Sequence, residues 1–368
     1  MQAKVQYVTF PENRRVLAIS DIHGNLEYFL GLLRKVDYSA DDILVLVGDI
    51  FEKGSENLAL LRCLMKLSKD HTIYKVRGNC DFVYEDVFEN GIRAAEVLPY
   101  ILRSDRSGGL LAQMNREMGW EVSDTMEMSV WREALIAHFS EEWTYLRHMP
   151  EILESPKVRF VHAGLTSDDL NVQEVGTCIK NDNFMEQGLK FGKFCVVGHW
   201  PAANYSDKGL INYNPRYHAW QNICSIDGGC QVKTLYGQLN ALILPNGDPS
   251  LMQFASYDQL PVAAALDAQE CSGTPRSIIW GADRHQVKEL KREDDFVLVR
   301  QLLTGLTLWV FQEHLYTYNG QLCCSEATDY APEIRPGDTF SLMRQTSRGY
   351  MIRKNGIVGW YGGRIQRI

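Results

Sequence analysis

The chain has 368 residues, of which 45% are hydrophobic and 23% charged, and these fractions are typical of a globular protein with room for more than one domain. Its net charge is −8 and no long basic run is present, so the sequence disfavours nonspecific binding to nucleic acid. Without a signal-peptide pattern, a membrane-spanning apolar stretch or a CxxC pair among its nine cysteines, we expect a cytoplasmic protein with reduced thiols that does not enter a membrane.

Three strand-and-turn segments follow one another between residues 16 and 79. VLAIS (16–20) precedes the polar turn DIHGN and an amphipathic helix over 26–36. ILVLVGD (43–49) precedes a second helix over 57–69, and IYKVRGN (73–79) ends in a third polar turn. This alternation predicts βαβ units and a sheet of parallel strands covered by helices.

The remaining chain changes character three times. Residues 82–149 carry apolar residues at helical spacing and predict a helical insertion, after which strand signals return in VRFVHAGL, KFCVVGH, NICSIDGG and LNALILP. This pattern closes a catalytic domain over 1–246. Gly- and Pro-containing turns predict a linker over 247–275, and short alternating stretches with an Asn-Gly turn predict a small all-β module over 276–368.

Metal-binding side chains follow the ends of the predicted strands, where ligand sites form in open α/β sheets. Singly, each has an ordinary explanation as a turn residue or a structural histidine. Together and in order, they indicate a metal centre, and their mixture of carboxylate, imidazole and amide oxygen suits Mn, Fe or Zn. The six residues are Asp21, His23, Asp49, Asn79, His162 and His199.

The motifs ISDIHGN, VGDIFEKG, VRGNCD, VHAGL and VVGHW resemble the five ordered motifs of the calcineurin-like metallophosphoesterases, over residues 14–246. Within that superfamily the phosphoprotein (Ser/Thr) phosphatase branch is most similar, because VRGNCD resembles its LRGNHE motif. The resemblance implies a β-sandwich of two mixed sheets flanked by helices.

The same resemblance implies two divalent metal ions, with Mn favoured. The first three of the six residues would hold one ion and the last four the other, so that Asp49 bridges both. A water shared by the ions would attack phosphorus in line. The implied activity is phosphoester hydrolysis in the style of a protein phosphatase, on a phosphorylated small molecule, a nucleotide or a phosphoprotein.

Several positions depart from the phosphatase pattern. Cys80 stands where the family has the histidine that protonates the leaving oxygen, and Glu52 stands where it has the Asp that orients that histidine. Lys53 replaces a phosphate-clamping Arg, and no arginine between the fourth and fifth motifs supplies a second clamp. The candidate catalytic residues are Asp49, Asn79, Cys80 and Glu52, and the candidate substrate-binding residues are Lys53, Arg77 and Arg216.

These departures leave the substrate open. A thiol is a poor acid near neutral pH, which favours leaving groups that need little protonation. The alternatives to a phosphomonoesterase are therefore a phosphodiesterase or dinucleoside polyphosphate hydrolase and, in another class, an inactive scaffold that recruits partners through its tail.

The tail itself resembles known modules. GDTFSLMRQTSRGYMIRKNGIVGWYGGRI resembles a bacterial SH3-like domain, and the stretch before it resembles a weaker copy. A tandem pair of SH3-like barrels over 276–368 is implied. Exposed aromatic residues such as Trp309, Trp360 and Tyr361 would then form a groove for a protein partner, unless they pack within the chain.

Overall fold

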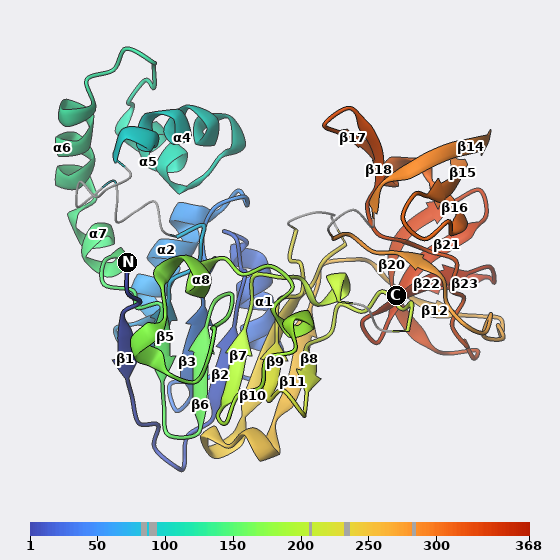
Figure 1. Ribbon diagram of the computed structural model, residues 1–368, viewed down its shortest axis with the longest axis horizontal. Coiled ribbons are helices and arrows are strands. Elements are labelled where there is room, and N and C mark those ends of the chain that lie inside the picture. The colour runs from blue at the N-terminus through green and yellow to red at the C-terminus, as the bar shows by residue number, and fades with distance from the viewer. Residues whose placement is uncertain (82–86, 88–93, 206–207, 232–235, 282–284) are drawn as a thin grey trace. The chain divides into compact units, whose positions relative to one another are not determined.

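The computed structural model describes residues 1–81, 87, 94–205, 208–231, 236–281 and 285–368 (Figure 1). The chain divides into two compact units. The N-terminal unit comprises Met1–Trp200 and Pro215–Asp258, and the C-terminal unit comprises Pro201–Asn214 and Gln259–Ile368. Within the described ranges, no helix combines the length and apolarity needed to cross a bilayer.

One sheet of the N-terminal unit has five strands in the order β11-β10-β2-β3-β4. Strands β2, β3 and β4 run parallel, as predicted, whereas β10 and β11 are antiparallel to their neighbours. Both β2 and β3 are fully buried, which explains their continuous apolar sequences. The strands are β2 (Val16–Ile19), β3 (Ile43–Val47), β4 (Thr72–Val76), β10 (Leu239–Leu244) and β11 (Gln253–Tyr257).

The second sheet has six strands in the order β1-β5-β6-β7-β9-β8. Strands β6, β7 and β9 are parallel, and β5 and β8 pair antiparallel with their neighbours β6 and β9. Sequence analysis missed β1, β5 and β8, each of which has only three residues. The strands are β1 (Val5–Tyr7), β5 (Ile152–Glu154), β6 (Val158–Val161), β7 (Phe194–Val197), β8 (Arg216–His218) and β9 (Ile223–Ser225).

The two sheets pack against each other through a shared apolar core. Val45 of β3 and Leu242 of β10 belong to the same buried cluster as Phe160 of β6 and Val196 of β7. A second cluster joins β2 and β3 to the apolar faces of α1 (Leu26–Lys35) and α2 (Asn57–Leu67). The predicted α/β arrangement, two mixed sheets flanked by helices, is confirmed.

Among the described residues, four helices gather at one end of the sheets, at the upper left of Figure 1. They are α4 (Ala94–Ser107), α5 (Leu110–Met118), α6 (Met128–His138) and α7 (Ser140–Leu146). The described part of the predicted insertion is thus helical, while its residues 82–86 and 88–93 lie outside the described ranges. One more short helix, α8 (Val175–Ile179), precedes β7.

The C-terminal unit consists of short antiparallel strands around two small apolar cores. The Asn355-Gly356 turn between β21 and β22 has positive φ angles at both residues, as this hairpin turn requires. A five-stranded sheet contains β12 (Val262–Ala265), β20 (Thr339–Thr346), β21 (Gly349–Lys354), β22 (Ile357–Tyr361) and β23 (Ile365–Arg367). The others are β13 (Ser277–Ile278), β14 (Val287–Glu293), β15 (Phe296–Gln301), β16 (Thr307–Phe311), β17 (Leu315–Tyr318), β18 (Gln321–Cys324) and β19 (Ala327–Thr328).

Two sequence expectations differ from these observations. The segment 247–275, predicted as a linker, contains β11 and β12, each of which joins a sheet of a different unit. Tyr361 does not lie on an exposed groove but packs within the chain, which was the alternative considered above. It is fully buried, because its ring fills the second small core and its hydroxyl donates to the carbonyl oxygen of Asp267 at 2.8 Å. The exact domain bounds and the SH3-like identity stay predictions.

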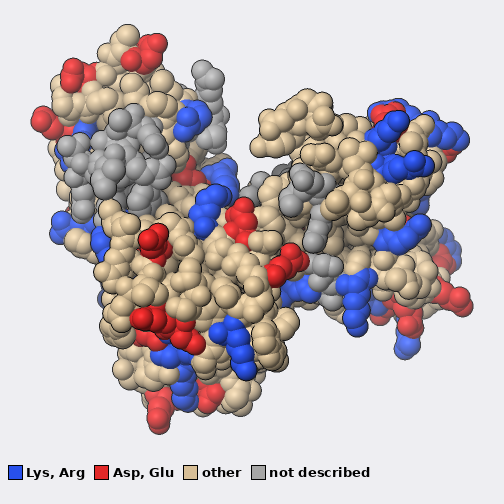
Figure 2. Space-filling view, in the orientation of Figure 1, with Lys and Arg blue, Asp and Glu red and all other residues tan. Residues whose placement is uncertain are grey.

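Charges of both signs are interspersed over the visible face of the N-terminal unit (Figure 2). Charges at the surface of this unit also pair with one another. Arg62 of α2, for example, donates to Glu117 of α5 at 2.7 Å.

Candidate metal centre

The six strand-end residues converge at the carboxyl edge of the two sheets. The Nε2 atom of His23 lies 3.7 Å from Asp21 Oδ1 and 3.8 Å from Asp49 Oδ2. On the other side of Asp49, Nε2 of His162 lies 3.3 Å from Oδ1. The ligand atoms of Asp49, His162 and His199 all lie within 4.8 Å of one another, as do those of His23, Asp49 and Cys80. Asp49 is thus common to two groups that could each hold an ion.

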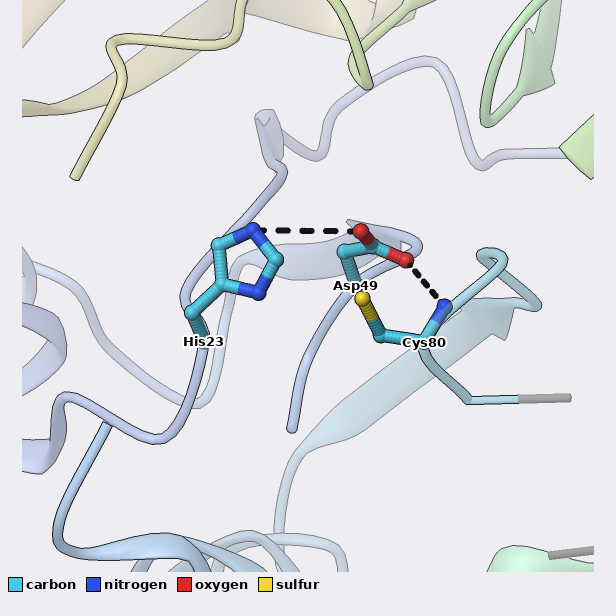
Figure 3. A group of neighbouring side chains, drawn as sticks. All are labelled: His23, Asp49 and Cys80. Carbon is cyan, nitrogen blue, oxygen red and sulfur yellow. Dashed lines mark hydrogen bonds and ion pairs between the residues drawn. The ribbon is translucent and has the colours of Figure 1, made fainter. Parts of the chain in front are cut away.

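Figure 3 shows one of these groups, with His23 and Cys80 on either side of the Asp49 carboxylate. The backbone N–H of Cys80 donates to Asp49 Oδ1 at 2.8 Å. Asp21, on the neighbouring turn, accepts the backbone N–H of His199 at 3.0 Å. Turns that follow different strands therefore hold each other's carboxylates in place.

The backbone is strained where these side chains meet. Asp21, His23, Asp49 and His199 all have φ between 48° and 66°, a region that residues with a Cβ rarely adopt. Such strain clusters at functional sites, where surrounding contacts over-determine the conformation.

Two glycines allow the close approach. A Cβ on Gly78 would lie 2.2 Å from Asp49 Oδ1, and a Cβ on Gly198 would lie 2.3 Å from Asp21 Oδ2. Any larger residue at these positions would displace the carboxylates. The Gly-Asn and Gly-His pairs of the third and fifth motifs follow from this packing.

The buried acids repel one another. Burial raises the pKa of Asp21 well above its ordinary value, and the carboxylates of Asp227 and Asp49 raise it further. Burial would likewise raise the pKa of Asp49, but His162, His23 and Lys53 together lower it. Because these acids are at most 2% exposed, a bound cation would relieve the repulsion.

The imidazoles are suited to bind such a cation because they are neutral. Burial lowers the pKa of His23 to about 3, with Lys53 adding to the effect, and lowers the pKa of His199 to about 4. Burial also lowers the pKa of His162. Neutral imidazole is the form that ligates metals.

The Asn79 amide provides a further test of fit. One atom of this amide lies 2.8 Å from Nδ1 of His199 and 3.2 Å from the carbonyl oxygen of Ile179. With its NH₂ group turned there, the amide donates to both. If the amide oxygen faces these atoms instead, the lone pairs of this oxygen, of Nδ1 and of the carbonyl oxygen point toward one another, as the lone pairs of ligands do around a cation. The residues present therefore fit a divalent metal ion.

Asp81, which sequence analysis did not select, organises the turn that carries Asp49. It accepts the backbone N–H groups of Ile50 at 3.2 Å and Gly78 at 3.0 Å. Burial raises the pKa of Asp81 to about 7, and Asp49 adds to this rise. Its position directly after the GNC triplet was the available signal.

Two further candidate residues of the site, Lys53 and Glu52, have different surroundings from each other. Lys53 Nζ lies 3.4 Å from His23 Nε2, and although burial would lower the pKa of Lys53, Cys80 and Asp49 raise it. Lys53 therefore brings a cation to the site. Glu52 accepts the backbone N–H of Leu110 at 3.0 Å, so its carboxylate anchors the start of α5.

The other two candidate clamp residues, Arg77 and Arg216, lie directly after β4 and at the start of β8. The Arg77 side chain is 3% exposed and pairs with buried Glu151, an arrangement that the sequence did not reveal. Arg216 begins the edge strand β8, opposite Ser225 of β9. The phosphate-binding role of both arginines stays a prediction.

Three further charged residues border the site without having been predicted. Asp227, which is 2% exposed, follows β9 as Asp49 follows β3, and this repeated strand-end position was a signal. Asp182 lies 2.8 Å from His199, and Lys180 lies 3.9 Å from Asp182. These two sit in a segment without strand or motif signals.

Residues 14–226 match the family model of the calcineurin-like phosphoesterases. The chain belongs to this family. Its members use divalent metal ions, and the chain is accordingly a hydrolytic phosphoesterase, as the resemblance implied. The prediction of an inactive scaffold loses its support.

Among curated proteins, a symmetrical bis(5′-nucleosyl)-tetraphosphatase of Nitrosomonas europaea is 30% identical over 191 residues. This match covers 50% of the chain and 59% of that relative, so two fifths of the relative has no counterpart in the match.

Solved structures are similar at lower identity. A crystal structure assigned as a candidate diadenosine tetraphosphatase is 20% identical, with a TM-score of 0.43, and the match covers 70% of this chain and 99% of that one. A protein serine/threonine phosphatase from Saccharomyces cerevisiae is 12% identical, with a TM-score of 0.39, over 70% of this chain and 84% of that one. At these values the two structures do not discriminate between substrates.

Proposed function

We propose that this phosphoesterase is a two-metal hydrolase of dinucleoside polyphosphates. The observation that carries the proposal is the placement of the Asp49 carboxylate between His23 on one side and His162 and His199 on the other. The tetraphosphatase activity of the relative from Nitrosomonas europaea supports the choice of substrate class.

In this proposal the six strand-end residues hold the metals as a shared set. Asp21, His23 and Asp49 hold one ion, and Asp49 with Asn79, His162 and His199 holds the other. When bound, two such ions neutralise phosphoryl oxygens and lower the pKa of water. Manganese is the favoured metal.

The chain's own residues add charge and position. Lys53, whose ammonium group lies beside His23, attracts the phosphate but does not offer the bidentate geometry of an arginine. Glu52 keeps α5 against the loop that carries Lys53. Together they shape the side of the site from which an anion enters.

The acidity of the Cys80 thiol determines which leaving groups the site can protonate. Burial raises the pKa of its thiol well above the ordinary value, with Asp49 adding to the effect, so the residue is a weak acid in the metal-free protein. A nucleoside polyphosphate leaves as a stable anion without a strong proton donor, whereas a serine alkoxide needs one. This chemistry favours polyphosphates over phosphoserine.

A phosphomonoesterase of the protein-phosphatase type is the second candidate. The motifs VRGNCD and NICSIDGGC favour it. Its distinguishing requirement is a histidine in the position of Cys80.

The test is a comparison of initial rates with Mn on diadenosine tetraphosphate, bis(p-nitrophenyl) phosphate and a phosphoserine peptide. We expect kcat/KM for the tetraphosphate to exceed that for the peptide by about 10²-fold, the lower range of a general acid's contribution. Preference for the peptide would replace this proposal by the second candidate, and preference for the bis ester would indicate a general phosphodiesterase.

Substitution of Cys80 sharpens the same comparison. Cys80→His supplies an imidazole donor and should raise turnover of the phosphoserine peptide by about tenfold or more. Turnover of the tetraphosphate should change little in this variant and in the control Cys80→Ser. Equal changes for both substrates in Cys80→His would contradict the assigned role of the thiol.

We also propose that the C-terminal unit is a tandem SH3-like module with a protein partner. The two small apolar cores and the Asn355-Gly356 hairpin support it. We expect a chain that ends at residue 258 to lose binding to a captured partner and to keep its phosphoesterase activity. Loss of activity in a shortened chain that still folds would argue against an independent role of the C-terminal unit.

A further inference from the structure

The two ring nitrogens of His199 face different surroundings. Nδ1 faces the Asn79 amide at 2.8 Å, on the side of the metal centre. Nε2 lies 2.8 Å from Oδ1 of Asp182. A neutral imidazole carries one N–H, and a carboxylate only accepts, so the proton belongs on Nε2 and the lone pair of Nδ1 is directed inward.

The backbone that carries Asp182 is held in place by its own loop. The Gln187 side-chain amide donates to Asn181 Oδ1 at 2.6 Å and to the Asp182 carbonyl oxygen at 3.2 Å. The next turn is anchored by Phe184, which is fully buried against Phe191. The carboxylate is half-exposed, yet the backbone on both sides of it is fixed.

His162 shows the same device with a different acceptor. Its Nδ1 lies 2.9 Å from the carbonyl oxygen of Val47, which leaves Nε2 to face Asp49. A backbone carbonyl inside the core orients this ring, which is 0% exposed. The His199 ring lies nearer the surface, and there the acceptor that orients the ring is the side chain of Asp182.

We propose that Asp182 is a positioning residue of the metal centre, which fixes the Nε2–H tautomer of His199 so that Nδ1 is free to bind a divalent cation. The inference deepens the proposed function and rests on it. Outer carboxylates of this kind orient ligating histidines and raise their basicity, and their loss typically weakens metal affinity about 10- to 100-fold. Lys180, 3.9 Å from Asp182, tempers the negative charge of the carboxylate.

The test uses the full chain and the variants Asp182→Ala and Asp182→Asn. Long-range ¹H–¹⁵N spectra of the metal-free protein at pH 7.5 report the tautomer of His199, and calorimetric titration with Mn reports affinity. We expect the Nε2–H form in the wild type, a mixture of tautomers in Asp182→Ala, and an Mn affinity about tenfold weaker in that variant. Asp182→Asn keeps an acceptor oxygen and should fall between the two.

Glu186→Ala is the matched control. Glu186 lies in the same loop, is exposed and carries the same charge, so its removal separates a general charge effect from the contact with His199. Unchanged tautomer and affinity in Asp182→Ala, or equal weakening in Glu186→Ala, would overturn the inference. A wild-type protein that binds no Mn would overturn the proposed function instead.

Discussion

The strand-end edge of the N-terminal unit and the surface of the C-terminal unit use charge in opposite ways. At the strand ends, Asp21, Asp49 and Asp227 crowd together with at most 2% exposure. In the C-terminal unit, Asp267 pairs with Arg364 and Asp338 pairs with Lys354 at the surface. Surface pairs contribute little to stability, and buried like charges oppose it. Polar groups that are costly to bury therefore mark the functional region.

The largest expected effect comes from Asp49→Asn. Asp49 borders both ligand groups, so removing its charge should lower turnover by about 10³-fold or more while the fold is retained. Initial rates with Mn and thermal unfolding followed by circular dichroism measure the two quantities. If the variant kept activity within tenfold of wild type, the conclusion that the buried charges at the strand ends mark the functional region would be contradicted.

Arg77→Ala should act on stability instead. The Arg77–Glu151 pair is buried, and its disruption should cost about 3–5 kcal/mol of unfolding free energy. Urea unfolding measures the loss, and a double Arg77→Met, Glu151→Met variant should recover part of it. A higher KM with unchanged stability would instead support the sequence-based prediction that Arg77 binds phosphate.

Buried thiols make the N-terminal unit sensitive to alkali. Burial raises the pKa of Cys195 to about 12, whereas an unfolded thiol titrates near pH ~8.5. Between these values the folded state holds more protons, so stability falls as pH rises, by about 1.4 kcal/mol per pH unit for each such thiol. Lys75, whose pKa burial lowers to about 8, contributes in the opposite direction.

The thiol contribution is isolated by comparing wild type with Cys195→Ala. Urea unfolding under reducing conditions between pH 7.5 and 10 should give a shallower decline in the variant. Identical slopes would show that this thiol does not contribute.

The smallest effect is expected in the C-terminal unit. The Arg348 guanidinium lies 4.5 Å from the ring centre of Phe296 and 4.3 Å from that of Trp309. Arg348→Ala should cost about 1 kcal/mol, and Arg348→Lys less, with no change in phosphoesterase activity. Altered kinetics in Arg348→Ala would show that the two regions are coupled.

Much of this contrast was readable from sequence because buried strands such as β2 and β3 are continuous apolar runs that end in polar turns. The six candidate ligands and the helices after β2 and β3 follow from that pattern. The short strands β1, β5 and β8 were missed because three residues carry too little periodicity to predict a strand. The buried pairing of Arg77 with Glu151, 74 residues away, could not be read from the sequence because it depends on tertiary packing.

Asp182 shows the other limit of sequence. Its side chain reaches His199 from a loop that is anchored by buried Phe184. Neither its neighbours nor its spacing resembles a motif. Positioning residues of this kind depend on tertiary packing, which short-range patterns do not encode.

Metal stoichiometry tests the central claim most directly. Purified protein incubated with Mn and freed of excess metal should retain about two ions per chain, and Asp49→Asn should retain fewer than one. Chelation should abolish turnover, and added Mn should restore it. Fewer than one ion per wild-type chain, together with activity that survives chelation, would contradict a two-metal centre at the strand ends.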